Sequence, residues 1–353
     1  RLGYVTMFLD LLLSPATPSN TARSGGIVFP IINSVAVALG SEPEKSPKKA
    51  GRYLMMNVYM VVKTTSYIFL TAMAPNALAL SLMAPILGFN IDWLHWFLAA
   101  SVPGLLCFFL IPLICYWVSP PEMKEVDNKE IARKGLEELG PMSYREKALI
   151  VLFIIALFGW IFSSALNLNA TIVALIVMVC CIVLSIVSWD DILKNKGGWN
   201  TLIWYGGIIG MSGLLEKAKF FEWLAESLKA ILQFEGQGTL ALIVILTLSV
   251  AVRYLFASGG AYVAAMVPVF ATVGHVAGAP AQLLALGLLF ATSYGGSVTH
   301  YGGGPGPIAF GAGYNDIKSW WTAGAIIAFG SLVVHLTIGM TWWNFLMSAG
   351  WLN

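Results

Sequence analysis

Residues Ala291 to Gly313 read A-T-S-Y-G-G-S-V-T-H-Y-G-G-G-P-G-P-I-A-F-G-A-G and combine many glycines and prolines with apolar residues. It lies inside a run from Tyr254 to Asn315 that contains no Asp, Glu, Lys or Arg. A helix interior tolerates Gly poorly and Pro worse, yet the apolar flanks are long enough to cross a membrane. Backbone groups freed in lipid must find partners inside the protein or in a water-filled cavity. The stretch therefore predicts a helix broken at membrane depth between Ser293 and Pro307, with a Gly-rich loop outside the membrane as the alternative.

The composition indicates a membrane protein. Of the 353 residues, 58% are hydrophobic and only 11% are charged, whereas soluble domains contain about 25% charged residues. The net charge of +2 gives no indication of nucleic-acid binding. All the cysteines lie in apolar runs and are expected to be buried thiols, namely Cys107, Cys115, Cys180 and Cys181. We therefore expect an all-α polytopic membrane protein.

Near the N-terminus, two short apolar arms at 2–13 and 27–39 flank a polar segment, Ser14 to Pro30. Each arm is too short to cross the bilayer comfortably. Two such arms around a polar tip predict a re-entrant hairpin. Ser19, Asn20 and Thr21 lie at this tip. Such residues suit a helix N-cap, and a helix start at membrane depth can also bind an anion.

A second broken helix is predicted after this hairpin. The apolar segment 53–74 carries Lys63 near its middle and ends in T-A-M-A-P-N, with Pro75 and Asn76 at the break. A shorter apolar piece then continues to Ile91, and residues 96–118 form an uninterrupted span.

The second half of the chain repeats this order. Two spans with a turn at Asn167 and Asn169 come first, then a Gly-rich span at 201–215 and an interfacial amphipathic helix at 216–235. Short arms at 239–252 and 262–276 flank the tip R-Y-L-F-A-S-G-G-A, which predicts a second re-entrant hairpin. The broken helix described first follows it, and residues 319–347 form the last span.

The repeated order predicts an inverted-repeat transporter. Pro75 and Pro305 are 230 residues apart, and the tips at Ser19 and Ser258 are 239 apart. The positive-inside rule places the loops at 45–52, 119–147 and 190–196 in the cytoplasm, so the hairpins enter from opposite faces. Because so few residues precede the first tip, N-terminal spans are expected to be missing from this sequence. The predicted segments are the first hairpin (1–40), a broken helix and span (52–118), a cytoplasmic loop (119–147), scaffold spans with the interfacial helix (148–235), the second hairpin (236–278), and a broken helix with the last span (280–353).

Four motifs carry a resemblance to a known family. They are T-P-S-N-T-A-R-S-G-G at 17–26, T-A-M-A-P-N at 71–76, T-H-Y-G-G-G-P-G-P at 299–307 and F-G-A-G-Y at 310–314. Together they resemble the divalent anion/sodium symporter family of di- and tricarboxylate carriers, and most of all its antiporter branch. The resemblance implies eleven transmembrane helices, two hairpins and an elevator-type transport domain, usually in a homodimer. It also implies exchange of acids such as malate, succinate, 2-oxoglutarate, citrate or tartrate, in a bacterial inner membrane rather than an organellar envelope.

The resemblance assigns roles to particular residues. The family's first Ser-Asn-Thr motif falls on Ser19, Asn20 and Thr21, where it contacts a substrate carboxylate, and the second falls on Ser258, Gly259 and Gly260, without the Asn and Thr side chains. No cofactor is expected; sodium is not favoured, and if bound it should lie near Ser19 and Asn20. The expected substrate-binding residues are Ser19, Asn20, Thr21, Ser258, Gly259, Gly260, Thr299 and Pro305, and those that break the helices are Pro75, Asn76, Gly295 and Gly296.

A dianion near the bilayer midplane needs positive charge, because an isolated charge is costly there. The candidates are Arg23, Lys63, Arg253 and His300. Each has an alternative explanation: the arginines can extend to an interface, Lys63 can be held by a backbone carbonyl, and His300 can be a neutral residue bonded to the backbone. The tryptophan pairs at 320–321 and 342–343 are expected to anchor the protein at the membrane interface.

These observations favour a secondary transporter that exchanges one dicarboxylate for another. The main alternative is a sodium-coupled dicarboxylate symporter. A membrane enzyme is disfavoured, because the sequence offers no catalytic Ser/His/Asp set and no metal cluster. The segment G-G-G-P-G-P also lacks the lysine and spacing of a phosphate-binding loop.

Overall fold

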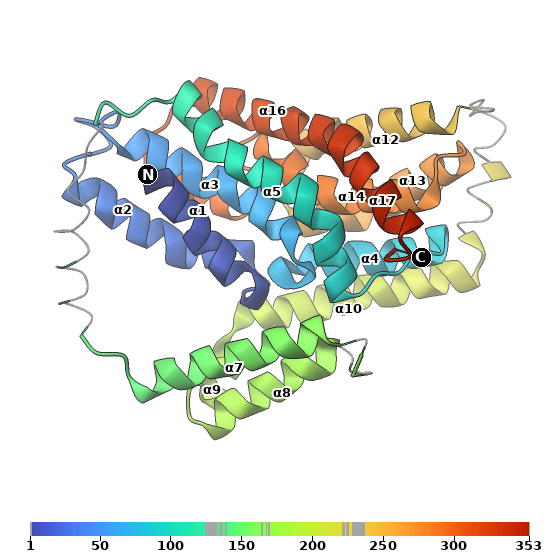
Figure 1. Ribbon diagram of the computed structural model, residues 1–353, viewed down its shortest axis with the longest axis horizontal. Coiled ribbons are helices and arrows are strands. Elements are labelled where there is room, and N and C mark those ends of the chain that lie inside the picture. Colours follow the sequence, from blue (N-terminus) through green and yellow to red (C-terminus); the bar gives the residue numbers. More distant parts are fainter. Residues whose placement is uncertain are drawn as a thin grey trace. The chain divides into compact units, whose positions relative to one another are not determined.

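The computed structural model describes residues 2–123, 133, 137, 140–163, 165–166, 168, 170–220, 223, 226–227 and 237–352. Every regular element within these residues is helical (Figure 1). Five of the described helices are long and apolar enough to cross a membrane by length and composition. This architecture fits the predicted all-α polytopic membrane protein. The chain divides into two compact units, of which one comprises residues 92–94 and 124–206 and the other comprises the rest.

The smaller unit contains α7 (Tyr144–Ile161), α8 (Ala170–Val183), α9 (Trp189–Lys194) and the beginning of α10 (Lys196–Lys217). α7 packs against α8. Cys180 and Cys181 on α8 are half-buried, so the prediction of buried thiols was correct only for Cys107 and Cys115. The predicted turn at Asn167 and Asn169 lies outside the described residues, as do about half of the 119–147 loop and most of the 216–235 helix.

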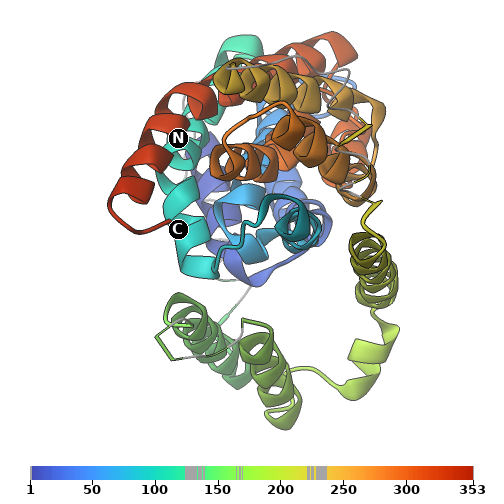
Figure 2. The same ribbon diagram turned by 90° about the vertical axis from the view of Figure 1, so that its right-hand side faces the viewer.

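The larger unit contains two helical hairpins. The first consists of α1 (Leu2–Leu13), a 3₁₀ turn (Ser14–Ala16), the π-helical segment η2 (Thr21–Val28) and α2 (Phe29–Ala38). The second consists of α12 (Gly238–Val252), the 3₁₀ turn η4 (Arg253–Leu255) and α13 (Gly259–Val276). Figure 1 shows the hairpins toward opposite ends of this unit, and Figure 2 views it from the α12–α13 end.

Two broken helices lie between the hairpins. The first is α3 (Gly51–Ile68) followed by α4 (Ala74–Leu87), and the second is α14 (Ala281–Tyr294) followed by α15 (Pro305–Gly311). α3 and α14 contact each other and are buried along almost their whole length. A helix buried on all sides belongs to the core, so the breaks after α3 and α14 lie inside the protein. The α13 helix packs on α4, and η2 packs on α15.

This unit also contains α5 (Trp93–Val118), α16 (Ile317–Val334), the π-helical segment η6 (His335–Gly339), α17 (Met340–Ser348) and the end of α10. The expectation that both tryptophan pairs anchor the membrane interface was wrong for Trp320 and Trp343, which are fully buried. The indole of Trp343 donates to the carbonyl of Ala99 at 2.9 Å, which satisfies its N–H inside the protein. The re-entrant course of the hairpins, the inverted repeat and the elevator mechanism stay predictions.

Candidate functional site

The first helix break is closed by the side chain of Asn76. Its amide nitrogen donates to the carbonyls of Ser66 at 2.7 Å and Phe69 at 3.1 Å. These carbonyls belong to the end of α3 and the segment after it, where the helical bonding pattern stops. Pro75 lies in the first turn of α4, where its missing N–H costs nothing. The T-A-M-A-P-N motif therefore stabilises an interruption of the helix inside the protein.

The second break is wider and is held by side chains from α3. The hydroxyl of Tyr59 donates to the carbonyls of Gly296 at 2.8 Å and Thr299 at 2.9 Å. A side chain at Gly296 would collide with the Gly302 carbonyl, because an added Cβ would lie 2.6 Å from that oxygen. The glycines thus let two backbone segments approach closely, and the unwound part between α14 and α15 folds back on itself.

Both hairpin tips contact both breaks. At the first tip, the Ala74 amide donates to the carbonyl of Pro18 at 2.8 Å, and Thr21 lies against Gly304, where an added Cβ would come 2.0 Å from the threonine Oγ1. At the second tip, an added Cβ on Gly259 would lie 3.9 Å from Pro75. The tips and the breaks therefore form one connected assembly.

Ser19 and Ser258 each serve as helix caps. The Oγ of Ser19 accepts from the Ala22 amide at 3.2 Å, and the Oγ of Ser258 accepts from the Ala261 amide at 3.3 Å. Both serines are exposed, and Asn20 is half-buried. The helix-capping alternative for the first motif is thus realised at Ser19. Within the described part of the chain, Asn20 makes one long side-chain contact, to the Met73 sulfur at 4.0 Å.

Lys63 and Arg253 converge on a single backbone oxygen. The Lys63 Nζ lies 3.1 Å and the Arg253 Nη2 lies 2.8 Å from the carbonyl oxygen of Gly302. Lys63 is 3% and Arg253 is 2% exposed. Among the residues that the structure describes, neither has a carboxylate within ion-pair distance. Two buried basic side chains therefore meet at one carbonyl group of the second break.

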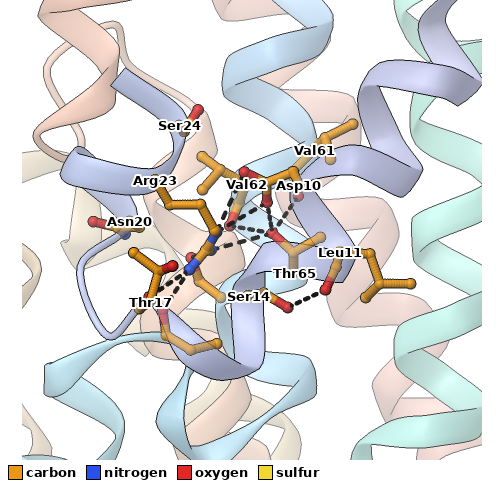
Figure 3. Close-up of polar contacts among 12 residues, drawn as sticks. Asp10, Leu11, Ser14, Thr17, Asn20, Arg23, Ser24, Val61, Val62 and Thr65 are labelled. Carbon is orange, nitrogen blue, oxygen red and sulfur yellow. Dashed lines mark hydrogen bonds and ion pairs between the residues drawn. The ribbon is translucent and has the colours of Figure 1, made fainter. Parts of the chain in front are cut away.

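Arg23, in contrast, has a full set of partners (Figure 3). Its Nε lies 3.3 Å from Asp10, its Nη1 donates to the carbonyls of Thr17 and Ala72, and its Nη2 donates to the hydroxyls of Thr65 and Ser66. Both Arg23 and Asp10 are buried. The charge of Arg23 is therefore cancelled within the protein.

His300 is held by Trp321. The indole Nε1 of Trp321 donates to the Nδ1 of His300 at 3.2 Å, and the imidazole lies 4.6 Å from the ring of Phe310. An indole N–H can only donate, so Nδ1 must be the unprotonated nitrogen. The contact thus favours a neutral imidazole with its proton on Nε2, but its described partner is an indole and not the backbone that the sequence analysis expected.

The structure adds residues that the sequence analysis did not consider. Tyr59 holds the second break, and Asp10 cancels the charge of Arg23. Asp10 lies in the first predicted apolar arm, where an ionisable residue is itself a signal of function. Gly302 is one of several glycines in its motif, and its role depends on its carbonyl group, which no residue pattern indicates.

Two hairpin tips that meet two broken helices around buried basic side chains are the arrangement of a membrane transporter. The sodium:sulfate symporter transmembrane region family model matches residues 1–349. The chain therefore belongs to this family, and the resemblance to divalent anion/sodium symporters is confirmed.

Three relatives show how far this similarity extends. An uncharacterized transporter of Haemophilus influenzae is 86% identical over all of this chain and 74% of its own length. The inner membrane protein YbhI of Escherichia coli is 61% identical over 99% of this chain and 73% of its own length. Dicarboxylate transporter 1 of Spinacia oleracea chloroplasts is 34% identical over 97% of this chain and 61% of its own length. These findings confirm a transporter rather than an enzyme, and an integral protein of a bacterial inner membrane.

Proposed function

We propose that this protein exchanges one dicarboxylate for another across the membrane without obligatory sodium. The observation that carries the proposal is the pair of buried cations, Lys63 and Arg253, at the Gly302 carbonyl. Both nitrogens bond to one oxygen, so they lie within about 6 Å of each other, where like charges in a protein interior repel by several kcal/mol. A dianion that bonds to both groups removes this repulsion. The spinach relative, named a dicarboxylate transporter, agrees with such a substrate.

The hydrogen bonds at the breaks support a site that works without sodium. Sodium is a hard cation and needs several oxygen ligands. At the first tip and break, carbonyls of Thr17 and Ala72 already accept from Arg23. At the second tip and broken helix, those of Phe256, Thr292 and Gly302 accept from Arg253. Fixed positive groups thus occupy carbonyl oxygens of the kind that a sodium ion would otherwise use.

The tips supply the remaining contacts in this proposal. Asn20 and Thr21 present an amide and a hydroxyl to one carboxylate, and the glycines after Ser258 present backbone N–H groups to the other. Gly allows such close approach of the backbone, and N–H groups at a helix start bind anions. Thr299 and Pro305 line the second break beside them, and His300 contributes a neutral N–H donor.

We also propose that transport follows an elevator mechanism in a homodimer, with the two halves of the chain as an inverted repeat. The order of hairpin and broken helix in each half supports this part of the proposal.

A counterflow assay in proteoliposomes tests the proposed function. Vesicles preloaded with unlabelled succinate should take up labelled C4 dicarboxylates, and the panel should extend to C5 and C6 acids to identify the preferred substrate. Empty vesicles should take up almost nothing, even with an inward sodium gradient. Rapid uptake into empty vesicles under that gradient would instead support the sodium-coupled symporter.

A further inference from the structure

We propose that Asp10 determines which substrate charge this transporter prefers. Asp10 cancels the charge of Arg23 beside the first tip, which leaves the site with two uncompensated cations. The site therefore favours dianions over trianions. This inference rests on the proposed function and concerns the same site. It begins from an asymmetry between the two hairpins. Arg23 and Arg253 are both buried beside a tip, yet only Arg23 has a carboxylate partner among the described residues.

Asp10 connects three separate elements. It lies on α1, and its carboxylate accepts from Arg23 on η2 and from the hydroxyl of Thr65 on α3 (Figure 3). All three side chains are at most 1% exposed. A carboxylate in this environment is held in one position by its partners, so its charge acts at a fixed place.

The charge that Asp10 cancels lies directly beside the substrate-binding tip. The Nη1 of Arg23 donates to the Thr17 carbonyl at 2.9 Å, two residues before Ser19, and to the Ala72 carbonyl at 2.7 Å. Charges in a protein interior are poorly screened. Without Asp10, the Arg23 charge would therefore act on any anion bound at Asn20 and Thr21.

The number of charges at the site then decides which anions bind well. With Asp10 present, Lys63 and Arg253 are the two described cations that lack a carboxylate partner here, and a dianion compensates them. A third carboxylate would be buried without a counter-charge, which is costly. Removing the Asp10 charge restores a third cation and makes a trianion the better match. Selectivity is a difference between two affinities, so this change is measurable even if both affinities fall.

The test compares succinate with propane-1,2,3-tricarboxylate as competitors of counterflow in the reconstituted full-length protein. Asp10→Asn keeps the shape of the side chain and removes its charge. In this variant, the preference for the fully ionised tricarboxylate over succinate should rise about tenfold, which is the effect of one partly screened charge. Competition by the tricarboxylate should also be repeated at lower pH, where it becomes a dianion. This comparison varies charge at constant size, and only the wild type should favour the dianionic form.

Three further variants separate charge from structure. Thr65→Val removes a hydrogen bond to Asp10 without changing charge, and should leave the preference unchanged. Arg23→Gln leaves Asp10 unopposed, and should shift the preference further toward dianions. Asp10→Asn combined with Arg23→Gln should restore the wild-type preference.

If the preference is unchanged in Asp10→Asn, the role of Asp10 is structural and the inference is wrong. If Asp10→Asn does not fold, the test uses the preference of Arg23→Gln between dianion and trianion. An unchanged preference in Arg23→Gln then overturns the inference. A wild-type protein that carries no dicarboxylate would instead refute the proposed function itself.

Discussion

The hydroxyl of Ser293 donates to the backbone carbonyl of Lys63 at 2.6 Å and joins the two central helices near the end of each. The two residues are 230 apart in the chain, the same separation as Pro75 and Pro305. This bond fixes the backbone from which the Lys63 side chain extends to Gly302. The position of one cation in the first half of the chain is therefore set by the second half.

Removing the charge of Lys63 should weaken substrate binding strongly. For Lys63→Met we expect a loss of about 2–5 kcal/mol, the range measured when one partner of a buried charge pair is truncated. This corresponds to a roughly 30-fold to several-thousand-fold increase in Kd. Substrate-dependent thermal stabilisation of the purified protein measures it. Lys45→Met removes an equally positive but exposed side chain and should have no effect; equal affinities in the two variants would contradict the assigned role of Lys63.

Asn20→Ala should abolish transport with little effect on folding. The Asn20 side chain is half-buried and its described side-chain bond is the 4.0 Å contact to the Met73 sulfur, so little packing is lost. Counterflow and the unfolding temperature should be measured on the same preparation. Ser34→Ala on α2 of the same hairpin is the control, because the described hydrogen bond of the Ser34 hydroxyl is to Pro30 on its own helix. If Asn20→Ala transports normally, the first motif caps a helix and does not bind substrate.

Gly296→Ala should disrupt the cation pair from within the protein. The added Cβ would lie 2.6 Å from the Gly302 carbonyl oxygen and 3.1 Å from the Arg253 Nη2, and a backbone oxygen cannot move away easily. We expect transport to be lost and stability to fall by about 1–3 kcal/mol, the cost of forcing extra volume into a packed interior. Gly330→Ala on α16 meets no atom within 4 Å. It should be neutral or stabilising by up to about 1 kcal/mol, and similar behaviour of the two variants would contradict the close packing at Gly296.

The sequence predicted those features that depend on local backbone chemistry. Gly and Pro interrupt apolar segments at Pro75 and between Gly295 and Pro305, and both interruptions appear as helix breaks in the structure. Lys63 could be singled out because an ionisable residue within an apolar segment is rare and functional by default. The helix bounds follow the predicted segments because the same apolar runs that suit a membrane also form the helices.

The pairing of charges could not be predicted, because it depends on three-dimensional contacts. Arg23 and Arg253 look alike in the sequence, and only the fold brings Asp10 to one of them. In the same way, Trp343 is buried where its indole bonds to Ala99 on α5, and no local sequence pattern indicates this contact. The neutral form of His300 also depends on a partner from a different helix.

Asp316 should contribute to stability in a pH-dependent way. It caps α16 by accepting from the Ser319 amide at 2.7 Å and pairs with Arg52 at 3.0 Å. The hydrogen bond from Ser319 is the main cause that holds its pKa below the ordinary value, and Arg52 lowers it further. A depressed carboxyl pKa stabilises the fold above the unfolded value, near 3.9, and the contribution is lost as the pH falls through the folded value. Unfolding temperatures of wild type and Asp316→Ala should therefore differ at pH 7, begin to converge as the pH falls below about 4, and meet below the folded pKa of Asp316.

The control for this prediction is Asp316→Asn. Asn caps a helix about as well as Asp, so this variant loses only a half-exposed ion pair, worth less than about 1 kcal/mol. Asp316→Ala loses the cap too and should be destabilised by about 0.5–2 kcal/mol. A difference between wild type and Asp316→Ala that stays constant down to acid pH would show that the carboxylate charge has no part in it.

Replacing all external Na⁺ by choline in preloaded vesicles should leave dicarboxylate exchange nearly unchanged. The second tip, Ser258-Gly259-Gly260, offers backbone N–H groups but only one side-chain oxygen, whereas sodium needs several oxygen ligands. Arg23 and Arg253 already bond to carbonyl oxygens at the two breaks. Arg253→Gln removes a fixed cation and frees such oxygens. This variant should therefore exchange substrate more slowly than the wild type, and sodium should increase its remaining exchange rate. Initial rates of labelled succinate uptake, with and without sodium, measure both effects. A collapse of wild-type exchange in choline would make the sodium-coupled symporter the better description of this protein.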